Sequence, residues 1–197
     1  MNILGAIIAG GQSSRMGGRE KAFVELGGVP LIDRVHSRIR FQVHSTIINA
    51  NGDPARFARF GLPVVPDLLA DVRTPLAGLH AVLSFAARHR FDAVLTVPSD
   101  APFLPFDLVD RLEEDGRATG AAVAASGGQT HYLTGLWSSA LLSVLTSAMQ
   151  EEGLRRVQDF ERKVLTAEVT WDVFPHDPFL NINTADDLVA AEAHVHD

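Results

Sequence analysis

Hydrophobic and polar positions follow two alternating patterns along this chain. Short apolar runs, typical of buried strands, are separated by segments whose apolar residues recur at the spacing of a helix. The runs predict strands at 3–9, 46–50, 62–65, 93–97, 120–126, 132–137 and 163–174. The spaced segments predict helices at 30–40, 55–59, 75–89, 105–115, 138–150, 154–160 and from Thr184 onward. This alternation indicates parallel strands joined by crossover helices, so the predicted fold is an α/β three-layer sandwich with a mostly parallel sheet.

The first apolar run ends in a glycine-rich turn that carries basic residues. Backbone N–H groups converge in such turns and bind phosphate, and Arg15 and Lys21 would add positive charge. Adjacent Gly10 and Gly11 exclude the dinucleotide fingerprint, and the sequence Gly-Arg-Glu-Lys-Ala at 18–22 excludes a P-loop. The alternative is an ordinary strand-to-helix turn with solvated cations. The length of the pattern favours phosphate binding.

Polar residues also follow the other predicted strands. The second, third and fourth strands end near Asn49, Asp67 and Asp100. In open parallel sheets, ligands bind outside the carboxyl ends of the strands. Asn and Asp are common turn formers, so each residue alone is a weak signal. Together with the glycine turn, the three residues predict one shared site at this edge.

Two of these residues suggest specific chemistry. Asp100 lies between Pro98 and Pro102, which hold its loop stiff. Mg²⁺ in proteins takes one or two carboxylates together with phosphate oxygens and water, so Asp100 is a candidate metal ligand. Asp67 is a candidate for guanine recognition, because its carboxylate can accept from N1–H and the exocyclic amine. The alternative for both residues is a turn or a helix cap.

Composition narrows the possible classes of protein. With 197 residues, 46% hydrophobic and 21% charged, the chain is predicted to form one domain, 1–197. Its net charge of -7 argues against a nucleic-acid partner but permits a local basic pocket. The lack of cysteine excludes a thiolate metal site and a cysteine nucleophile, and it fits the cytoplasm. No apolar stretch approaches the ~20 residues of a membrane span, and the run 3–9 fits a buried strand rather than a signal peptide.

The glycine-rich turn resembles a known signature. Residues 9–21 are similar to the A-G-G-x-x-x-R-M-G-x-x-K pattern of nucleotidyltransferases, and especially to the L-A-G-G-x-x-x-R-M-G-G-x-D-K form of the molybdenum cofactor guanylyltransferases. Glu20 stands where that family usually has Asp. Further similarities to the family's P-x-D-x-P, G-P-L-A-G, R-R-V and F-x-N-x-N-T segments lie at 98–102, 74–78, 155–157 and 179–184. Thr74 replaces the first glycine of G-P-L-A-G, and 129–132 lacks the arginine and proline of many relatives.

This resemblance implies a Rossmann-like nucleotidyltransferase fold of the glycosyltransferase-A-like type. Its N-terminal half would bind GTP and its C-terminal half the acceptor. The implied reaction transfers GMP from GTP to molybdopterin bearing molybdenum, with Mg²⁺ as cofactor and pyrophosphate as by-product. Cofactor-biosynthesis proteins and recipient molybdoenzymes are the implied protein partners. The alternatives are the cytidylyltransferase of the same cofactor, a nucleotidyltransferase for another phosphorylated acceptor such as a sugar phosphate, and a degenerate, non-catalytic binder.

The resemblance also implies roles for individual residues. The implied catalytic residues are Arg15, Lys21 and Asp100, of which Asp100 is also the metal ligand. The implied GTP-binding residues are Ile8, Ala9, Gly10, Gly11, Lys21, Asn49, Asp67, Gly78 and Asp100. The implied acceptor-binding residues are Arg155, Arg156, Asn181 and Asn183. The arginine pair has an alternative role at a helix end, and the two asparagines have one in a plain turn into a capped helix.

Overall fold

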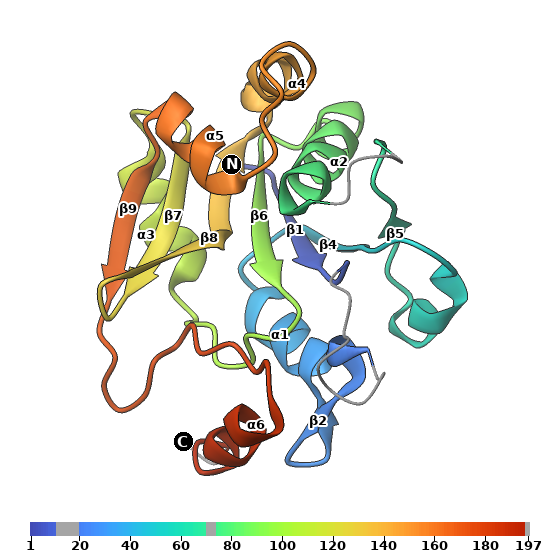
Figure 1. Ribbon diagram of the computed structural model, residues 1–197, viewed down its shortest axis with the longest axis vertical. Helices are drawn as coiled ribbons and strands as arrows, with labels where there is room; N and C mark the ends of the chain where they lie inside the picture. Colours follow the sequence, from blue (N-terminus) through green and yellow to red (C-terminus); the bar gives the residue numbers. More distant parts are fainter. Residues whose placement is uncertain (11–19, 70–73, 196–197) are drawn as a thin grey trace.

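A seven-stranded sheet forms the centre of the molecule (Figure 1). The computed structural model describes residues 1–10, 20–69 and 74–195. The strand order is β5-β4-β1-β6-β8-β7-β9. The strands of this sheet are β1 (Ile3–Ile8), β4 (Ser45–Asn49), β5 (Val64–Val65), β6 (Ala93–Pro98), β7 (Ala121–Ser126), β8 (Gln129–Ser138) and β9 (Ala167–Trp171). Only β8 runs antiparallel to its neighbours within this sheet, which confirms the prediction of a mostly parallel sheet.

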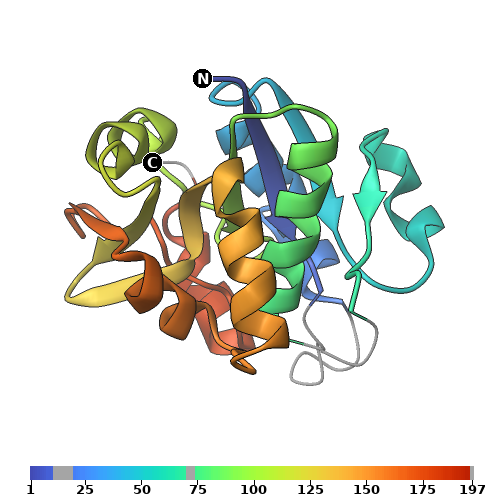
Figure 2. The same ribbon diagram turned by 90° about the horizontal axis from the view of Figure 1, so that it is seen from above.

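Helices cover both faces of the sheet (Figure 2). The α-helices are α1 (Leu31–Ile39), α2 (Pro75–Arg88), α3 (Leu108–Gly116), α4 (Leu142–Gln150), α5 (Val157–Val164) and α6 (Ala185–Glu192). The 3-10 helices are η1 (Lys21–Phe23), η2 (Pro54–Phe60) and η3 (Ser139–Leu141). On β1, Ile3 and Ile7 pack in the cluster that includes α1 and α3, whereas Leu4 and Ala6 pack in the cluster that includes α2, α4 and α5. The alternation along β1 follows the two-residue period of a strand and confirms the three-layer sandwich.

Helix α1 and strand β7 show how local sequence forms these elements. Leu31, Val35 and Ile39 recur at helical spacing on α1, and all three are fully buried. Strand β7 consists of alanines, one valine and Ser126, and all six of its residues are buried. A strand of small residues lets helices approach closely on both faces, which fits its place inside the sheet.

Several predicted boundaries were wrong. Strand β8 begins at Gln129 rather than at 132, and the helix predicted from 138 is the 3-10 helix η3 followed by α4 from Leu142. Helix α3 begins at Leu108, after the turn residue Asp107, rather than at 105. Helix α5 begins at Val157 rather than at 154. This helix continues to Val164 and ends at Leu165, which has a φ of 53°. Of the strand predicted at 163–174, only the residues of β9 are extended, and the first predicted residues belong to α5.

Strand β8 pairs irregularly with β7. Val123 pairs with Gly135, but the next residue, Ala124, pairs with His131. Residues 132–134 are therefore extra on the β8 side and form a bulge. Bulges redirect side chains, and this one falls between Val123 and Ala124, in the middle of β7. The irregularity pairs His131 with Ala124 and so sets its position relative to the carboxyl end of β7.

The C-terminal segment returns to the start of the chain. After β9 it runs back past the carboxyl edge of the sheet and forms α6 beside the hairpin of β2 (Glu25–Leu26) and β3 (Val29–Pro30) (Figure 1). Gly27 N donates to Glu192 Oε1 over 3.0 Å, and Leu26, Ile182 and Ala191 share a buried cluster. Among the described residues, no helix combines the length and apolar character that a membrane span requires.

Candidate functional site

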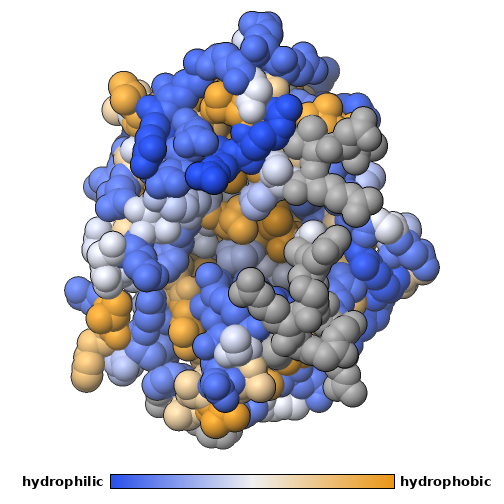
Figure 3. All heavy atoms as spheres, in the orientation of Figure 1, coloured by the Kyte–Doolittle hydropathy of each residue, from blue (hydrophilic) through white to orange (hydrophobic). Residues whose placement is uncertain are grey.

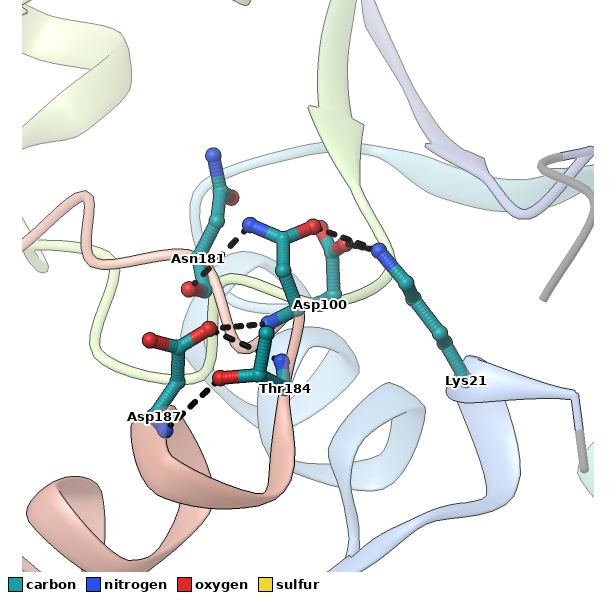
Figure 4. Close-up of polar contacts among 6 residues, drawn as sticks. Lys21, Asp100, Asn181, Thr184 and Asp187 are labelled. Atoms are coloured by element: carbon teal, nitrogen blue, oxygen red, sulfur yellow. Dashed lines mark hydrogen bonds and ion pairs between the residues drawn. The ribbon is translucent and has the colours of Figure 1, made fainter. Parts of the chain in front are cut away.

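Three distant segments meet beside the end of β6. Lys21 Nζ donates to Asp100 Oδ2 over 3.3 Å and to Asn183 Oδ1 over 2.5 Å. Ile182 N donates to Asp100 O over 2.9 Å, so backbone pairing also joins these segments. Figure 4 shows Lys21 reaching toward Asp100 from the opposite side to α6. The structure thus brings together three of the predicted site residues.

The first turn of α6 holds Asn183 in place. Thr184 caps this helix, and its side chain accepts from Asp187 N over 3.1 Å. Asp187 Oδ2 accepts from the backbone N–H groups of Asn183 and Thr184, both over 2.8 Å (Figure 4). The sequence predicted a helix from Thr184 onward, and this capping box confirms where it begins. Asn181 is exposed, and its side chain extends away from the capping residues (Figure 4).

Asp100 lies in a setting that favours a neighbouring cation. Burial raises the pKa of the Asp100 carboxyl, and the positive charge and hydrogen bond of Lys21 offset part of that rise. The side chains of Lys21 and Asp100 are 24% and 17% exposed. In the described ranges, no group of three or more His, Cys, Asp or Glu could hold a metal by itself. A single carboxylate of this kind fits a divalent ion whose other ligands are phosphate oxygens and water.

A second polar cluster lies at the ends of β4 and β5. Asn49 Nδ2 donates to Asp67 Oδ1 over 3.1 Å and to Val65 O over 3.0 Å. Asn51 Nδ2 donates to Asp67 Oδ2 over 2.8 Å, and Asp67 N donates to Asn51 Oδ1 over 2.9 Å. Both carboxylate oxygens of Asp67 are therefore oriented by amides. The sequence indicated Asn49 and Asp67 but gave no reason to select Asn51.

Gly78 supports this cluster from the first turns of α2. A Cβ at Gly78 would lie 2.6 Å from Asn49 Oδ1 and 3.8 Å from Asp67 Oδ1. The absence of a side chain at Gly78 therefore makes room for the Asn49 amide. The predicted contact of Gly78 with a nucleotide base stays a prediction, because the position already has a structural reason to be glycine.

The end of β1 leads into the glycine-rich turn. Ala9 N donates to Asn49 O over 2.9 Å, and Ser99 N donates to Ile8 O over 3.1 Å. These bonds join the end of β1 to the segments that carry Asn49 and Asp100. Gly10 follows and is exposed. The predicted phosphate-binding residues Gly11 and Arg15 lie outside the described residues.

The arginine pair lies in the segment between α4 and α5. Arg155 Nη1 donates to Met149 O over 3.0 Å and to Leu154 O over 2.8 Å. The Arg155 guanidinium therefore binds backbone at the end of α4, which is the alternative role that the sequence left open. Arg156 precedes α5 and is exposed. A contact of either arginine with an acceptor stays a prediction.

A third polar cluster, at the carboxyl end of β7, was not predicted. Ser126 Oγ donates to Asp177 Oδ1 over 2.8 Å, and Oγ lies 2.7 Å from His131 Nε2. Since the one serine proton goes to Asp177, His131 Nε2 is the donor to Oγ. This proton order does not activate Ser126 as a nucleophile, because the histidine would have to accept the serine proton. The cluster is a fixed polar group and not a hydrolytic triad.

His131 is held by aromatic contact as well as by hydrogen bonding. Its ring stacks on Phe179 with 4.8 Å between centroids. Burial lowers the pKa of His131, and the nearby Asp177 partly offsets this. The only sequence signal for His131 was the departure of 129–132 from the family pattern. Asp177 had no signal, because it lies 51 residues from Ser126 in the chain.

The molecular surface has a hollow on the face seen in Figure 3. Figure 3 shows this face hollowed near its middle, with hydrophobic residues in the hollow and hydrophilic residues around it. Between the base of the glycine turn and the bulge of β8, the side chains of Ile8, Pro75, Tyr132 and Leu133 line a shallow depression that encloses no space for a water molecule. It therefore lies between β1 and β8.

The chain is similar to proteins with known names over almost its whole length. The sequence profile of the MobA-like NTP transferase domain matches residues 5–165. A molybdenum cofactor guanylyltransferase of Bradyrhizobium sp. is 46% identical over 192 residues, which cover 95% of this chain and 91% of that protein. A protein of the same name from Rhodopseudomonas palustris is 44% identical over 191 residues and covers 94% and 90%.

Solved structures show the same arrangement of the chain. Molybdopterin-guanine dinucleotide biosynthesis protein A of Archaeoglobus fulgidus superposes with a TM-score of 0.72 and 26% identity, covering 98% of both chains. A 2-C-methyl-D-erythritol 4-phosphate cytidylyltransferase of Thermus thermophilus has a TM-score of 0.69 at 18% identity, covering 98% of both chains. The second likeness concerns the fold alone. The predicted Rossmann-like nucleotidyltransferase fold is confirmed.

Proposed function

The chain belongs to the MobA-like NTP transferase family, among the molybdenum cofactor guanylyltransferases, and we propose that it transfers GMP from GTP to molybdopterin bearing molybdenum. The products are the guanine dinucleotide cofactor and pyrophosphate. The observation that supports this function is the pair of carboxylates at one sheet edge, with Asp67 oriented by two asparagine amides and Asp100 paired with Lys21. They provide a base end and a phosphate end for one nucleotide.

Asp67 is the residue that we assign to guanine recognition. Its two oxygens can accept from N1–H and from the exocyclic amine of guanine. Each oxygen keeps a lone pair for this purpose, since each accepts one proton from Asn49 or Asn51. Adenine and cytosine do not offer the same pair of donors, so GTP is the expected nucleotide.

Lys21 and Asp100 are the residues that we assign to the triphosphate. Nucleotidyltransferases generally use a divalent metal, and we assign Mg²⁺ to Asp100 together with the phosphate oxygens. When bound, Mg²⁺ would supply electrostatic stabilisation of the charge that develops on the leaving pyrophosphate. Lys21 contributes a second positive charge to the same phosphates. Arg15 and the backbone at Gly10 and Gly11 complete the proposed phosphate end, and Ile8 and Ala9, which are bonded to the neighbouring segments, lead into it.

The acceptor needs no activation by a base. Its terminal phosphate is already anionic, so one of its oxygens can form the new bond to the α-phosphorus of GTP. The bond from that phosphorus to the bridging oxygen breaks, and its electron pair leaves with pyrophosphate. Catalysis then consists of holding two anions together in line. We assign Asn181, Asn183, Arg155 and Arg156 to binding of the acceptor. The cytoplasm stays the predicted location of the protein.

Product analysis with two nucleotides tests this function. Purified protein is incubated with Mg²⁺, molybdenum-bearing molybdopterin and either GTP or CTP. We expect guanine dinucleotide and stoichiometric pyrophosphate with GTP, and far less product with CTP. Preference for CTP would identify a cytidylyltransferase instead. Turnover with a sugar phosphate but not with molybdopterin would identify a different acceptor, and nucleotide binding without either product would indicate a non-catalytic binder.

A matched pair of variants links this activity to the proposed base end. Asp67→Asn replaces one acceptor oxygen with a donor, and we expect it to lower turnover of GTP strongly. Asp53→Asn is the control, because Asp53 is an exposed cap that accepts from Ala55 N over 2.9 Å. Equal loss in the two variants would contradict the assignment of Asp67.

A further inference from the structure

Two neighbouring residues at the end of the glycine-rich turn form ion pairs in different directions, Lys21 toward the proposed phosphate end and Glu20 toward the 3-10 helix η2. Lys21 pairs with Asp100 at the phosphate end. Glu20 pairs with Arg56, with 3.1 Å between Oε2 and Nη1. Glu20 is the one position in this motif at which the chain departs from the family pattern described above. Its carboxylate therefore has a defined partner on η2.

Arg56 is held from several directions. Its Nη1 donates to Glu20, and its Nη2 donates to the backbone oxygen of Asn51. Its guanidinium lies over the ring of Phe57, 4.9 Å from the centroid, and Phe57 is fully buried. A planar guanidinium can make two directed bonds at once, which an ammonium cannot match in the same geometry. Arg56 thus joins the glycine turn to the segment that follows β4.

Asn51, whose carbonyl accepts from Arg56, also forms hydrogen bonds with Asp67. The Asn51 amide donates to Asp67 Oδ2 over 2.8 Å and accepts from Asp67 N over 2.9 Å. These two bonds fix both the backbone and the side chain of Asp67. Because Arg56 bonds to the carbonyl of Asn51, it restrains the residue that orients the carboxylate. A continuous series of contacts runs from Glu20 through Arg56 and Asn51 to Asp67.

We propose that Arg56 is a specificity-determining positioning residue, which sets the base preference of the site through Asn51 and is itself anchored by Glu20. Arg56 need not touch the nucleotide, since its effect is exerted on the position of Asp67. This inference rests on the proposed function, in which Asp67 recognises guanine. It also gives Glu20 a role, because a glutamate extends one methylene further than aspartate toward Arg56.

Nucleotide affinities test this role directly. The dissociation constants of GTP, ITP and ATP are measured with Mg²⁺ for the wild type and for Arg56→Gln. ITP keeps N1–H but lacks the exocyclic amine, so the GTP-to-ITP ratio reports the contact of that amine. For Arg56→Gln we expect about tenfold weaker GTP binding and a GTP-to-ITP preference reduced at least about threefold, with ATP little changed.

Arg59 provides the matched control. It lies on the same 3-10 helix, pairs with Asp33 over 2.6 Å and lies 4.7 Å from the centroid of Phe60. Arg59→Gln therefore removes a comparable ion pair and ring contact, and we expect the nucleotide ratios to stay within about twofold of the wild type. A role of Arg56 in stability alone would lower the melting temperature of Arg56→Gln without changing its GTP-to-ITP ratio, and that result would overturn the inference.

Two further variants separate the possible outcomes. If Asp67→Asn removes the GTP-to-ITP preference and Arg56→Gln retains it, the result supports the proposed function and contradicts the proposed role of Arg56. If Asp67→Asn keeps the preference, guanine recognition by Asp67 falls as well. Arg56→Lys keeps a charge for Glu20 but loses the forked geometry, so it should show a partial loss and replaces Arg56→Gln if that variant does not fold. A wild-type ratio in Arg56→Lys would then overturn the inference.

The anchoring by Glu20 has its own test. Glu20→Gln should reduce the GTP-to-ITP preference, and the double variant Glu20→Gln with Arg56→Gln should be no worse than Arg56→Gln alone. Additive losses would show that Glu20 and Arg56 act separately and would overturn the anchored series of contacts.

Discussion

The two halves of the sheet edge are built in different ways. At the proposed nucleotide end, β4, β5 and β6 are parallel, and Asn49, Asp67 and Asp100 lie at or just after their carboxyl ends. At the other half of the edge, where the segment after β9 carries the proposed acceptor residues Asn181 and Asn183, Ser126 follows the same rule, but His131 lies on the antiparallel β8 and Asp177 on that segment. Parallel strands place their ends together automatically. An antiparallel strand with a bulge does so only through its particular register.

The largest expected effect concerns the pair at the phosphate end. Asp100→Asn and Lys21→Ala should each lower the rate of GMP transfer by about 1000-fold, because each removes a charge that we assign to the triphosphate and its metal ion. Rates are measured by pyrophosphate release at saturating substrates. Lys163→Ala is the control, since Lys163 forms an exposed pair with Glu152 over 2.9 Å. Near-normal transfer by a folded Asp100→Asn protein would contradict the phosphate-end assignment.

A much smaller effect, on nucleotide affinity, is expected for a substitution at Gly78. Gly78→Ala would place a methyl group 2.6 Å from Asn49 Oδ1, so the amide must move and Asp67 loses a partner. We expect GTP binding to weaken by about tenfold, measured by titration calorimetry. In an Asn49→Ala background the clash is absent, and Gly78→Ala should then have little further effect. An equal effect in both backgrounds would indicate that Gly78 acts by approaching the base.

The acceptor end should respond separately from the nucleotide end. His131→Asn removes the ring that stacks on Phe179, and we expect the KM for the acceptor to rise about tenfold with the affinity for GTP unchanged. Thr130→Val is the control, because Thr130 bonds to the exposed Glu168 over 2.6 Å. If His131→Asn weakened GTP binding as strongly as acceptor binding, the division of the edge into two ends would fail.

The smallest expected effect is on stability at the start of α6. The Asn183 N–H group, and then the Thr184 hydroxyl, hold the pKa of Asp187 below its ordinary value. A lowered carboxyl pKa stabilises the folded state above the ordinary pKa of ~3.9, and this stability disappears as the pH falls through the folded value. At pH 7, Asp187→Ala should lower the free energy of unfolding by roughly 0.5 kcal/mol, because the carboxylate lies at the surface and solvent screens its interactions.

Urea unfolding at several pH values checks this prediction. The difference between wild type and Asp187→Ala should shrink as the pH falls through the lowered pKa. Asp186→Ala, in the same helical turn, should cost less because it removes only a charge near the helix dipole. A constant difference between wild type and Asp187→Ala down to the lowest pH would mean that the ionised cap is not the cause.

Much of the nucleotide end could be predicted because its signals are local. Each strand ends in a turn within a few residues of Asn49, Asp67 or Asp100, and the capping box at Thr184 spans four residues. The beginning of α5 could not be predicted in this way, because the apolar spacing at 154–160 does not distinguish a helix from the loop that precedes one. Arg155 illustrates the consequence, since its guanidinium binds the carbonyls of Met149 in α4 and of Leu154, and the residue does not lie on α5.

The sequence by itself determined the alternation of strands and helices and the strand ends that carry polar residues, and it predicts phosphate binding at the glycine-rich turn. Only the tertiary structure decided which distant residues meet. Lys21 and Asn183 are 162 residues apart, and Glu20 and Arg56 are 36 apart. Hydrophobic periodicity and capping act over one or two turns of chain, so they are visible in the sequence. Contacts between segments depend on strand order, register and the path of the C-terminal return, which only the packed sheet specifies.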